Sequence, residues 1–369
     1  MLSIRNVDKI YHSRGKPPVH AVRALDMEVG AGEIVALLGS SGCGKTSTLR
    51  MIAGFESVSA GSITLAQRPI HDLSPAKRGV AMAFEGYSLY PPLTVRENIA
   101  FALKAQQLSR SEIAQRVDSI ARLVEIEDIL DLHPRALSGG QQQRVSLARA
   151  LVREADLYLL DEPMGQLEPQ LRAVLRGRIK GLLAERGMTA IFVTHDQTEA
   201  SALADRIAVM EDGVLQQFAG ERELKNRPAN LFVASFIGEP PMNLLETAVA
   251  PEEGGFRLSA GSDVAFHIAR QTLNVAAQQA LVRADRIKVG IRPQRIAIGS
   301  GEARLRVVSN QWLGDQSHIA GECAGHLLVA VTSSKVAARP GDIVPCALES
   351  RHLHIFGADG VCVRHAEAR

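Results

Sequence analysis

The sequence lacks any apolar run long enough to cross a membrane, although 46% of its 369 residues are apolar. Cysteine is scarce: the four cysteines, at positions 43, 323, 346 and 362, form neither C-x-x-C pairs nor a disulfide pattern, which favours a reducing cytoplasm. The net charge of only +2 predicts no general attraction to nucleic acid or anionic lipid. The first residues, Met-Leu-Ser-Ile-Arg-Asn-Val, are typical of a strand and not of a secretory signal. We therefore expect a soluble protein that reaches a membrane only through a partner.

The most informative stretch is Gly-Ser-Ser-Gly-Cys-Gly-Lys-Thr at residues 39–46, which fits G-x-x-x-x-G-K-[ST]. An apolar run at 33–38 precedes it and a helical pattern follows, so a nucleotide site is favoured over a chance Gly/Ser turn. Backbone N–H groups and the helix dipole would hold phosphates. Lys45 would bind the outer phosphates, and Thr46 or Ser47 would offer Mg²⁺ a hydroxyl. The predicted phosphate-binding residues are Gly39, Ser40, Ser41, Gly42, Cys43, Gly44, Lys45, Thr46 and Ser47.

Two further apolar runs end in residues with acidic or basic side chains that can take part in catalysis. Residues 157–160 lead to Asp161 and Glu162, and residues 189–194 lead to His195. A solvated strand end and a structural histidine are the ordinary interpretations of these residues. Because ligands of an α/β sheet bind at the carboxyl ends of its strands, a functional interpretation is favoured. Asp161 is then a Mg²⁺ ligand, Glu162 polarises a water, and His195 faces the γ-phosphate.

Two other features allow both a structural and a functional interpretation. Tyr11 stands among polar residues ahead of the phosphate loop, where it is either an ordinary exposed tyrosine or a ring that stacks on adenine. Leu137-Ser-Gly-Gly-Gln141 begins a helix with Ser138 as N-cap. The same glycines leave backbone N–H groups open to an anion.

The pattern along the chain predicts two domains. The predicted fold class is an α/β P-loop NTPase domain at 1–237, with antiparallel strands at its start and a helical insertion at about 95–135. Gly238-Glu-Pro-Pro241 is a suitable boundary. Short β-rich runs with Gly and Pro follow, which predicts an all-β domain at 238–369, a small barrel.

The order of these motifs resembles the ATP-binding subunits of ABC transporters over essentially the full chain. The phosphate loop is followed by the family signature at 137–141, by Leu-Tyr-Leu-Leu-Asp-Glu-Pro at 157–163, and by the switch histidine of Thr194-His-Asp196. Within that family the chain is most similar to the maltose-type sugar-importer subunits. The matching stretches are residues 87–91, 236–244 and 289–293, of which the last two belong to a C-terminal TOBE/OB-type regulatory domain.

The resemblance implies a mechanism with ATP and Mg²⁺. Tyr11 would stack on adenine, Glu162 would be the general base, and His195 would stabilise the transition state. Two ATP-binding subunits would close head to tail, so that each signature caps the γ-phosphate held by the other subunit. The capping residues would be Ser138, Gly139, Gly140 and Gln141.

The resemblance also implies partners. Transmembrane permease subunits would contact the loop at 85–92, a solute-binding protein would act indirectly, and nucleic acid would have no part. The chain would be peripheral at the cytoplasmic face of the inner membrane.

Two positions depart from the family pattern. Glu85 replaces a glutamine that can touch Mg²⁺ and the attacking water, although a carboxylate is still an acceptable Mg²⁺ ligand. Met164-Gly-Gln-Leu-Glu168 stands where the family favours Ser-Asn-Leu-Asp. With these two changes, two assemblies are open: a homodimer, and a heterodimer with a paralogue whose residues offset the changes.

The expected function is the ATP-hydrolysing motor of an importer for a sugar, polyol or glycerol-type solute. The alternatives are the same role for spermidine, ferric iron or sulfate, and a weakly hydrolysing regulatory subunit. An ABC ATPase acting on ribosomes or DNA is disfavoured by the low net charge and by the importer-like second domain. The solute would be chosen by partners, so no residue of this chain reveals it.

Overall fold

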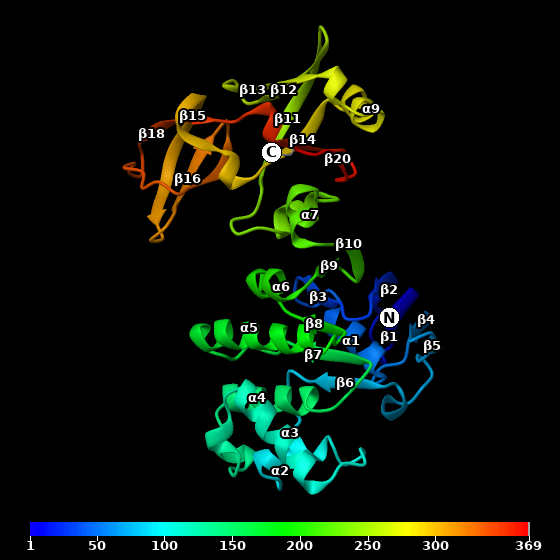
Figure 1. Cartoon of the computed structure of the whole chain (residues 1–369). Helices are drawn as coiled ribbons and strands as arrows, with labels where there is room; N and C mark the ends of the chain where they lie inside the picture. Colours follow the sequence, from blue (N-terminus) through cyan, green and yellow to red (C-terminus); the bar gives the residue numbers. More distant parts are fainter. Residues whose placement is uncertain (368–369) are drawn as a thin grey trace. The chain divides into compact units, whose positions relative to one another are not determined.

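The computed structural model describes residues 1–367, which form two compact units, Met1–Glu221 and a second unit from Arg222 onward (Figure 1). The predicted boundary lies later, at 237/238. The residues between the two positions belong to the second unit, where the Arg292 guanidinium donates to the carbonyl oxygens of Lys225, Ala234 and Ile237. The division at 237/238 as a functional boundary stays a prediction.

The first unit is built on two sheets. Its strands are β1 (Leu2–Tyr11), β2 (Val19–Val29), β3 (Ile34–Gly39), β4 (Ala60–Leu65), β5 (Arg68–Pro69), β6 (Val80–Ala83), β7 (Leu157–Asp161), β8 (Ala190–Val193), β9 (Arg206–Glu211) and β10 (Val214–Ala219). The central sheet has the order β10-β9-β3-β8-β7-β6, and the four pairings from β9 to β6 are parallel. The second sheet, β2-β1-β4-β5, is antiparallel, as predicted for the start of the chain.

The helices of the first unit follow the predicted α/β pattern. They are α1 (Lys45–Ala53), α2 (Val95–Phe101), α3 (Arg110–Leu123), α4 (Gly139–Leu151), α5 (Pro169–Glu185) and α6 (Gln197–Leu203), with short 3-10 helices η1 (Pro75–Lys77), η2 (Glu127–Ile129) and η3 (Pro134–Ala136). Helices α2 and α3 form the predicted insertion, and Figure 1 shows them beside α4 at one end of the unit. Capping boxes at Thr94, Ser109 and Ser138 satisfy the first N–H groups of α2, α3 and α4.

The core of the first unit explains why the motifs meet at one edge. Every residue of β3, β7 and β8 is buried, as expected for parallel strands covered on both faces. Because β3, β8 and β7 are adjacent and parallel, their carboxyl ends lie together. The residues that follow these three strands are therefore neighbours in space.

The second unit is β-rich, as predicted. Its strands are β11 (Asn243–Glu252), β12 (Gly255–Ala260), β13 (Val264–Ala269), β14 (Arg286–Ile291), β15 (Ala297–Trp312), β16 (Ser317–Cys323), β17 (His326–Thr332), β18 (Ile343–Ala347), β19 (Leu353–Phe356) and β20 (Cys362–Arg364). They form two antiparallel sheets, β13-β12-β11-β14-β19-β20 and β17-β16-β15-β18, which share one apolar core.

The second unit also contains helices. They are α7 (Glu221–Asn226), α8 (Leu231–Phe236) and α9 (Val275–Arg283), with 3-10 helices η4 (Arg270–Thr272), η5 (Pro293–Arg295) and η6 (Ser350–His352). The β-rich sequence pattern did not predict α9. Asn274 caps it by accepting a hydrogen bond from the Ala277 N–H, and Ala277 and Leu281 pack into the core.

Candidate functional site

The phosphate loop has the predicted strand–loop–helix geometry. Strand β3 ends at Gly39 and α1 begins at Lys45. Gly44, the N-cap, has φ = 102°, and a Cβ there would lie 2.4 Å from the Ala21 carbonyl oxygen. Only glycine combines this left-handed backbone with so close an approach of another chain segment. The loop thus delivers the helix N-terminus, with its open N–H groups, to the end of the central sheet.

Lys45 lies over the loop that it follows. Its ammonium donates to the Gly39 and Ser40 carbonyl oxygens, at 2.9 Å each, and lies 3.6 Å from Cys43 Sγ. Burial raises the pKa of Cys43, although Lys45 opposes the shift. Cys43 is therefore a neutral packing residue inside the loop, and Ser40, Ser41 and Gly42 form its exposed rim.

Tyr11 and Ser47 are brought together from different elements. The Tyr11 hydroxyl donates to Ser47 Oγ at 3.2 Å, and Lys9 Nζ lies 4.7 Å from the centroid of the Tyr11 ring. The ring is thus beside the first turn of α1. Stacking of this ring on adenine stays a prediction.

The predicted Mg²⁺ ligands also lie close together. Asp161, at the end of β7, is 4% exposed and accepts a hydrogen bond from Thr46 Oγ1 at 3.4 Å. Burial, with the negative charges of Glu85 and Glu162, raises the pKa of Asp161 to about 6. A buried carboxylate with acidic neighbours and a hydroxyl beside it fits a hard divalent cation, because such ions take oxygen ligands and offset the repulsion.

Glu162 and His195 face each other across the ends of β7 and β8. His195 Nδ1 lies 3.3 Å from Glu162 Oε2. Glu162 itself has φ = 47°, and its N–H donates to the Val193 carbonyl oxygen at 3.0 Å. A left-handed backbone at a non-glycine residue is strained and is found most often at functional sites. The geometry therefore presents both side chains at one end of the central sheet.

The signature residues have a structural role of their own. Ser138 Oγ accepts from the Gln141 N–H, and the Gln141 side chain accepts from the Ser138 N–H. A Cβ on Gly139 would lie 2.4 Å from Gln166 Oε1, so the signature borders the 164–168 loop. Helix capping is thus confirmed, and binding of a γ-phosphate by Ser138, Gly139, Gly140 and Gln141 stays a prediction.

Two supporting residues were not predicted from the sequence. The buried Gln143 side chain donates to the Glu162 carbonyl oxygen at 2.7 Å and accepts from the Gln166 N–H at 3.0 Å. Arg172 donates to the Gly165 and Leu167 carbonyl oxygens and pairs with Asp196, the residue after the switch histidine. Gln143 is one of three consecutive glutamines, so its sequence neighbours gave no signal that this one is buried.

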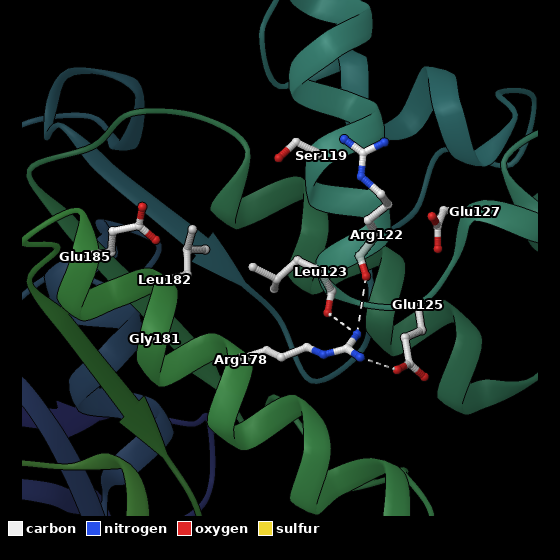
Figure 2. Close-up of a pocket in the computed structure, with 9 residues that line it drawn as sticks. All are labelled: Ser119, Arg122, Leu123, Glu125, Glu127, Arg178, Gly181, Leu182 and Glu185. Carbon is white, nitrogen blue, oxygen red and sulfur yellow. Dashed lines mark hydrogen bonds and ion pairs between the residues drawn. The ribbon is translucent and has the colours of Figure 1, made fainter.

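Figure 2 shows a cavity of the first unit that is lined by other residues. It measures about 710 Å³ and lies between α3, η2 and α5. Arg178 crosses one side of it, 2.9 Å from Glu125 and within hydrogen-bond distance of the Arg122 and Leu123 carbonyl oxygens. The lining residues include none of the predicted nucleotide-binding residues, so this cavity is not the nucleotide site.

Comparison with known proteins agrees with this geometry. The ABC transporter family model matches residues 22–165, and the TOBE domain model matches residues 289–356. The sn-glycerol-3-phosphate import ATP-binding protein UgpC of Bordetella pertussis is 40% identical over 363 residues, which cover 97% of each chain. The chain belongs to the ATP-binding subunits of ABC transporters. The protein of the same name from Cupriavidus metallidurans is 38% identical over 371 residues, or 96% of each chain. The family resemblance is therefore confirmed.

Solved structures give the same result for the cassette fold. The dimeric bacterial ABC transporter cassette MJ0796 has a TM-score of 0.57 and 29% identity, and it aligns with 60% of this chain and 98% of its own. A dimeric post-hydrolysis state of that cassette, bound to ADP and Pi, has a TM-score of 0.56. As a member of this family, the chain is a nucleotide-binding ATPase of a transporter. No helix among residues 1–367 is both long and apolar enough to span a membrane.

Proposed function

We propose that this chain is the motor of an importer for sn-glycerol-3-phosphate or a closely related polyol phosphate. The supporting observation is the likeness to UgpC proteins, which extends through the second unit and covers 97% of both chains. The test is uptake of radiolabelled glycerol-3-phosphate into vesicles that contain the chain and its cognate permease. Uptake of spermidine, ferric iron or sulfate in place of glycerol-3-phosphate would contradict the proposed solute and leave the ATPase assignment intact.

The proposed chemistry follows from the Glu162–His195 pair. Glu162 accepts a proton from a water, whose oxygen then attacks the γ-phosphorus, and ADP leaves. The exposed His195 ring donates a hydrogen bond to the γ-phosphate oxygens as their charge rearranges. Lys45 and the loop N–H groups hold the phosphates in place. Thr46 and Asp161, with Glu85 nearby, would hold Mg²⁺, which would supply positive charge to the phosphate oxygens.

The ATP site is proposed to be completed by a second ATP-binding subunit. Ser138 is exposed at the start of α4, where a phosphate on another subunit can reach it. A dimer of two copies of this chain would contain Glu85 and the Gly165–Glu168 loop in both subunits. A paralogue could instead supply the family's usual glutamine and Ser-Asn-Leu-Asp loop in one subunit. The subunit composition of the purified transporter decides between these assemblies. Normal transport rates with two copies of this chain alone would exclude the heterodimer.

The permease is proposed to contact the loop at residues 85–92. Tyr90 is 43% exposed and packs on Phe101 of α2, with ring centroids 4.7 Å apart. Arg149 holds the loop by donating to the Tyr87 and Ser88 carbonyl oxygens. An exposed aromatic pair on a braced loop suits a protein partner. The permease would place this chain at the cytoplasmic face of the inner membrane and link it to a solute-binding protein.

Replacing Glu85 by glutamine should maintain or raise ATPase activity and extend it to lower pH. The charge of Glu85 contributes to the raised pKa of Asp161, so its removal lowers that pKa and keeps Asp161 ionised in more acidic solution. The measurement is ATP turnover of the assembled transporter against pH. Glu185→Gln, which removes an exposed charge on α5, should leave the profile unchanged. If Glu85→Gln lowers the rate of ATP turnover and the fall in rate at acidic pH occurs at the same pH as in the wild type, the role given to Glu85 is contradicted.

A fragment of residues 1–221 should fold and bind ATP with the affinity of the full chain. It contains the complete first unit, including every predicted nucleotide-binding residue. The solved MJ0796 chains align with a similar share of this chain, 60%, over 98% of their own length. Equilibrium binding of a fluorescent ATP analogue is the measurement, with Lys45→Ala as the non-binding control. A folded fragment without nucleotide affinity would contradict the prediction.

A further inference from the structure

The second unit brings together three side chains that commonly bind metals. One ligand atom each from His354, Cys362 and His365 lies within 4.8 Å of the other two. Cys362 Sγ lies 3.3 Å from His365 Nδ1. The rings of His354 and His365 meet edge to face, with centroids 5.8 Å apart. The cluster contains only nitrogen and sulfur donors.

The fold holds Cys362 and Arg364 against β19, where His354 lies. Strand β20 pairs with β19, and Cys362 lies opposite Phe356. Arg364 Nη1 donates to the Ser350 and Leu353 carbonyl oxygens at 3.1 and 3.0 Å. These contacts hold the chain at Cys362 and at Arg364, the residue before His365. The three side chains are thus placed together by the sheet and need little ordering to bind an ion.

His354 has an unsatisfied polar atom. Its side chain is 2% exposed, and its Nδ1 is buried without a hydrogen-bond partner among residues 1–367. A buried polar atom without a partner is costly, and each one calls for an explanation.

We propose that His354, Cys362 and His365 bind one thiophilic d¹⁰ cation, Zn²⁺ or Cu⁺. Zn–N and Zn–S bonds of about 2.1 and 2.3 Å separate neighbouring ligands of a tetrahedral ion by about 3.5 Å, close to the Cys362–His365 contact. Two imidazoles and a thiolate suit these ions and not Mg²⁺ or Ca²⁺, which take oxygen ligands. On binding, the Cys362 thiol, which donates to the Arg364 carbonyl oxygen, releases its proton to solvent.

The bound ion would join residues 362–365 to β19. Three protein ligands complete a trigonal Cu⁺ site and leave one position of a Zn²⁺ site open to water.

The test uses the full-length chain after treatment with a chelator. It is titrated with Zn²⁺, and separately with Cu⁺ under anaerobic reducing conditions, each against a chromophoric chelator. We expect one equivalent of at least one ion to bind. Cys362→Ser and His365→Ala should each weaken binding by about 100-fold or more. His267→Ala, which removes an exposed histidine that pairs with Glu252 in the same unit, should bind as the wild type does.

Co²⁺ provides a second measurement, in which the wild-type result does not depend on a variant's folding. The wild-type complex should show a thiolate-to-Co²⁺ charge-transfer band, and Cys362→Ser should lack it. The proposal is overturned if the wild type binds neither Zn²⁺ nor Cu⁺ in competition with the chelator. It is also overturned if folded Cys362→Ser and His365→Ala bind as tightly as the wild type, because the metal would then lie elsewhere.

Discussion

Replacing Glu162 by glutamine should leave ATP binding intact and lower ATP turnover by about 100-fold or more. Glutamine keeps the size of the side chain but cannot accept the proton of an attacking water. Binding should persist, because the change removes a negative charge near the phosphates. His195 Nδ1, at 3.3 Å from Glu162 Oε2, can still meet the amide oxygen, so the local geometry is kept.

The measurement for Glu162→Gln pairs equilibrium ATP binding with single-turnover hydrolysis in the assembled transporter. Lys45→Ala is the matched comparison, since it should lose ATP binding itself by removing the charge at the phosphates. The two variants thus separate binding from chemistry. Wild-type turnover in Glu162→Gln would show that another group accepts the proton.

Replacing Arg78 by methionine should destabilise the first unit by about 3 kcal/mol. Arg78 is 2% exposed, and its guanidinium donates to four carbonyl oxygens at 2.6–3.0 Å, those of Met51, Ile52, His71 and Leu73. Two of these carbonyls belong to the last turn of α1, the helix that carries the phosphate loop. Methionine fills the space but leaves all four oxygens without their donor.

The stability of each unit can be followed separately during urea unfolding. The only tryptophan, Trp312, lies in β15, so its fluorescence reports the second unit, whereas nucleotide-analogue binding reports the first. Arg78→Met should lower the midpoint of nucleotide-analogue release and leave the Trp312 transition unmoved. Arg68→Met is the control, since Arg68 is exposed and contacts one carbonyl oxygen, that of Lys77. Equal midpoints for the two variants would contradict the role of Arg78.

The sequence alone predicted the elements that act locally. The phosphate loop could be recognised because its glycines, Lys45 and Thr46 are close together in the chain and their backbone requirements are specific. The cap at Ser138 could be recognised for the same reason, since capping involves residues three apart. The change to β-rich structure after residue 240 followed from composition and short alternating runs.

The sequence predicted that Asp161, Glu162 and His195 lie at strand ends, but only the tertiary structure decided their distances. Strand order in the central sheet is β3-β8-β7, which differs from chain order, so the Glu162–His195 contact depends on which strands pair. The role of Gln143 under Glu162 depends on how α4 packs, and a run of three glutamines carries no such information.

The His354, Cys362 and His365 cluster depends on the pairing of β19 with β20. The short helical pattern of α9 lies among β-rich runs, which do not predict a helix. The sequence by itself therefore determined the motifs whose residues are close together in the chain. The tertiary structure decided which motifs contact one another, because contacts between residues distant in the chain depend on the whole fold.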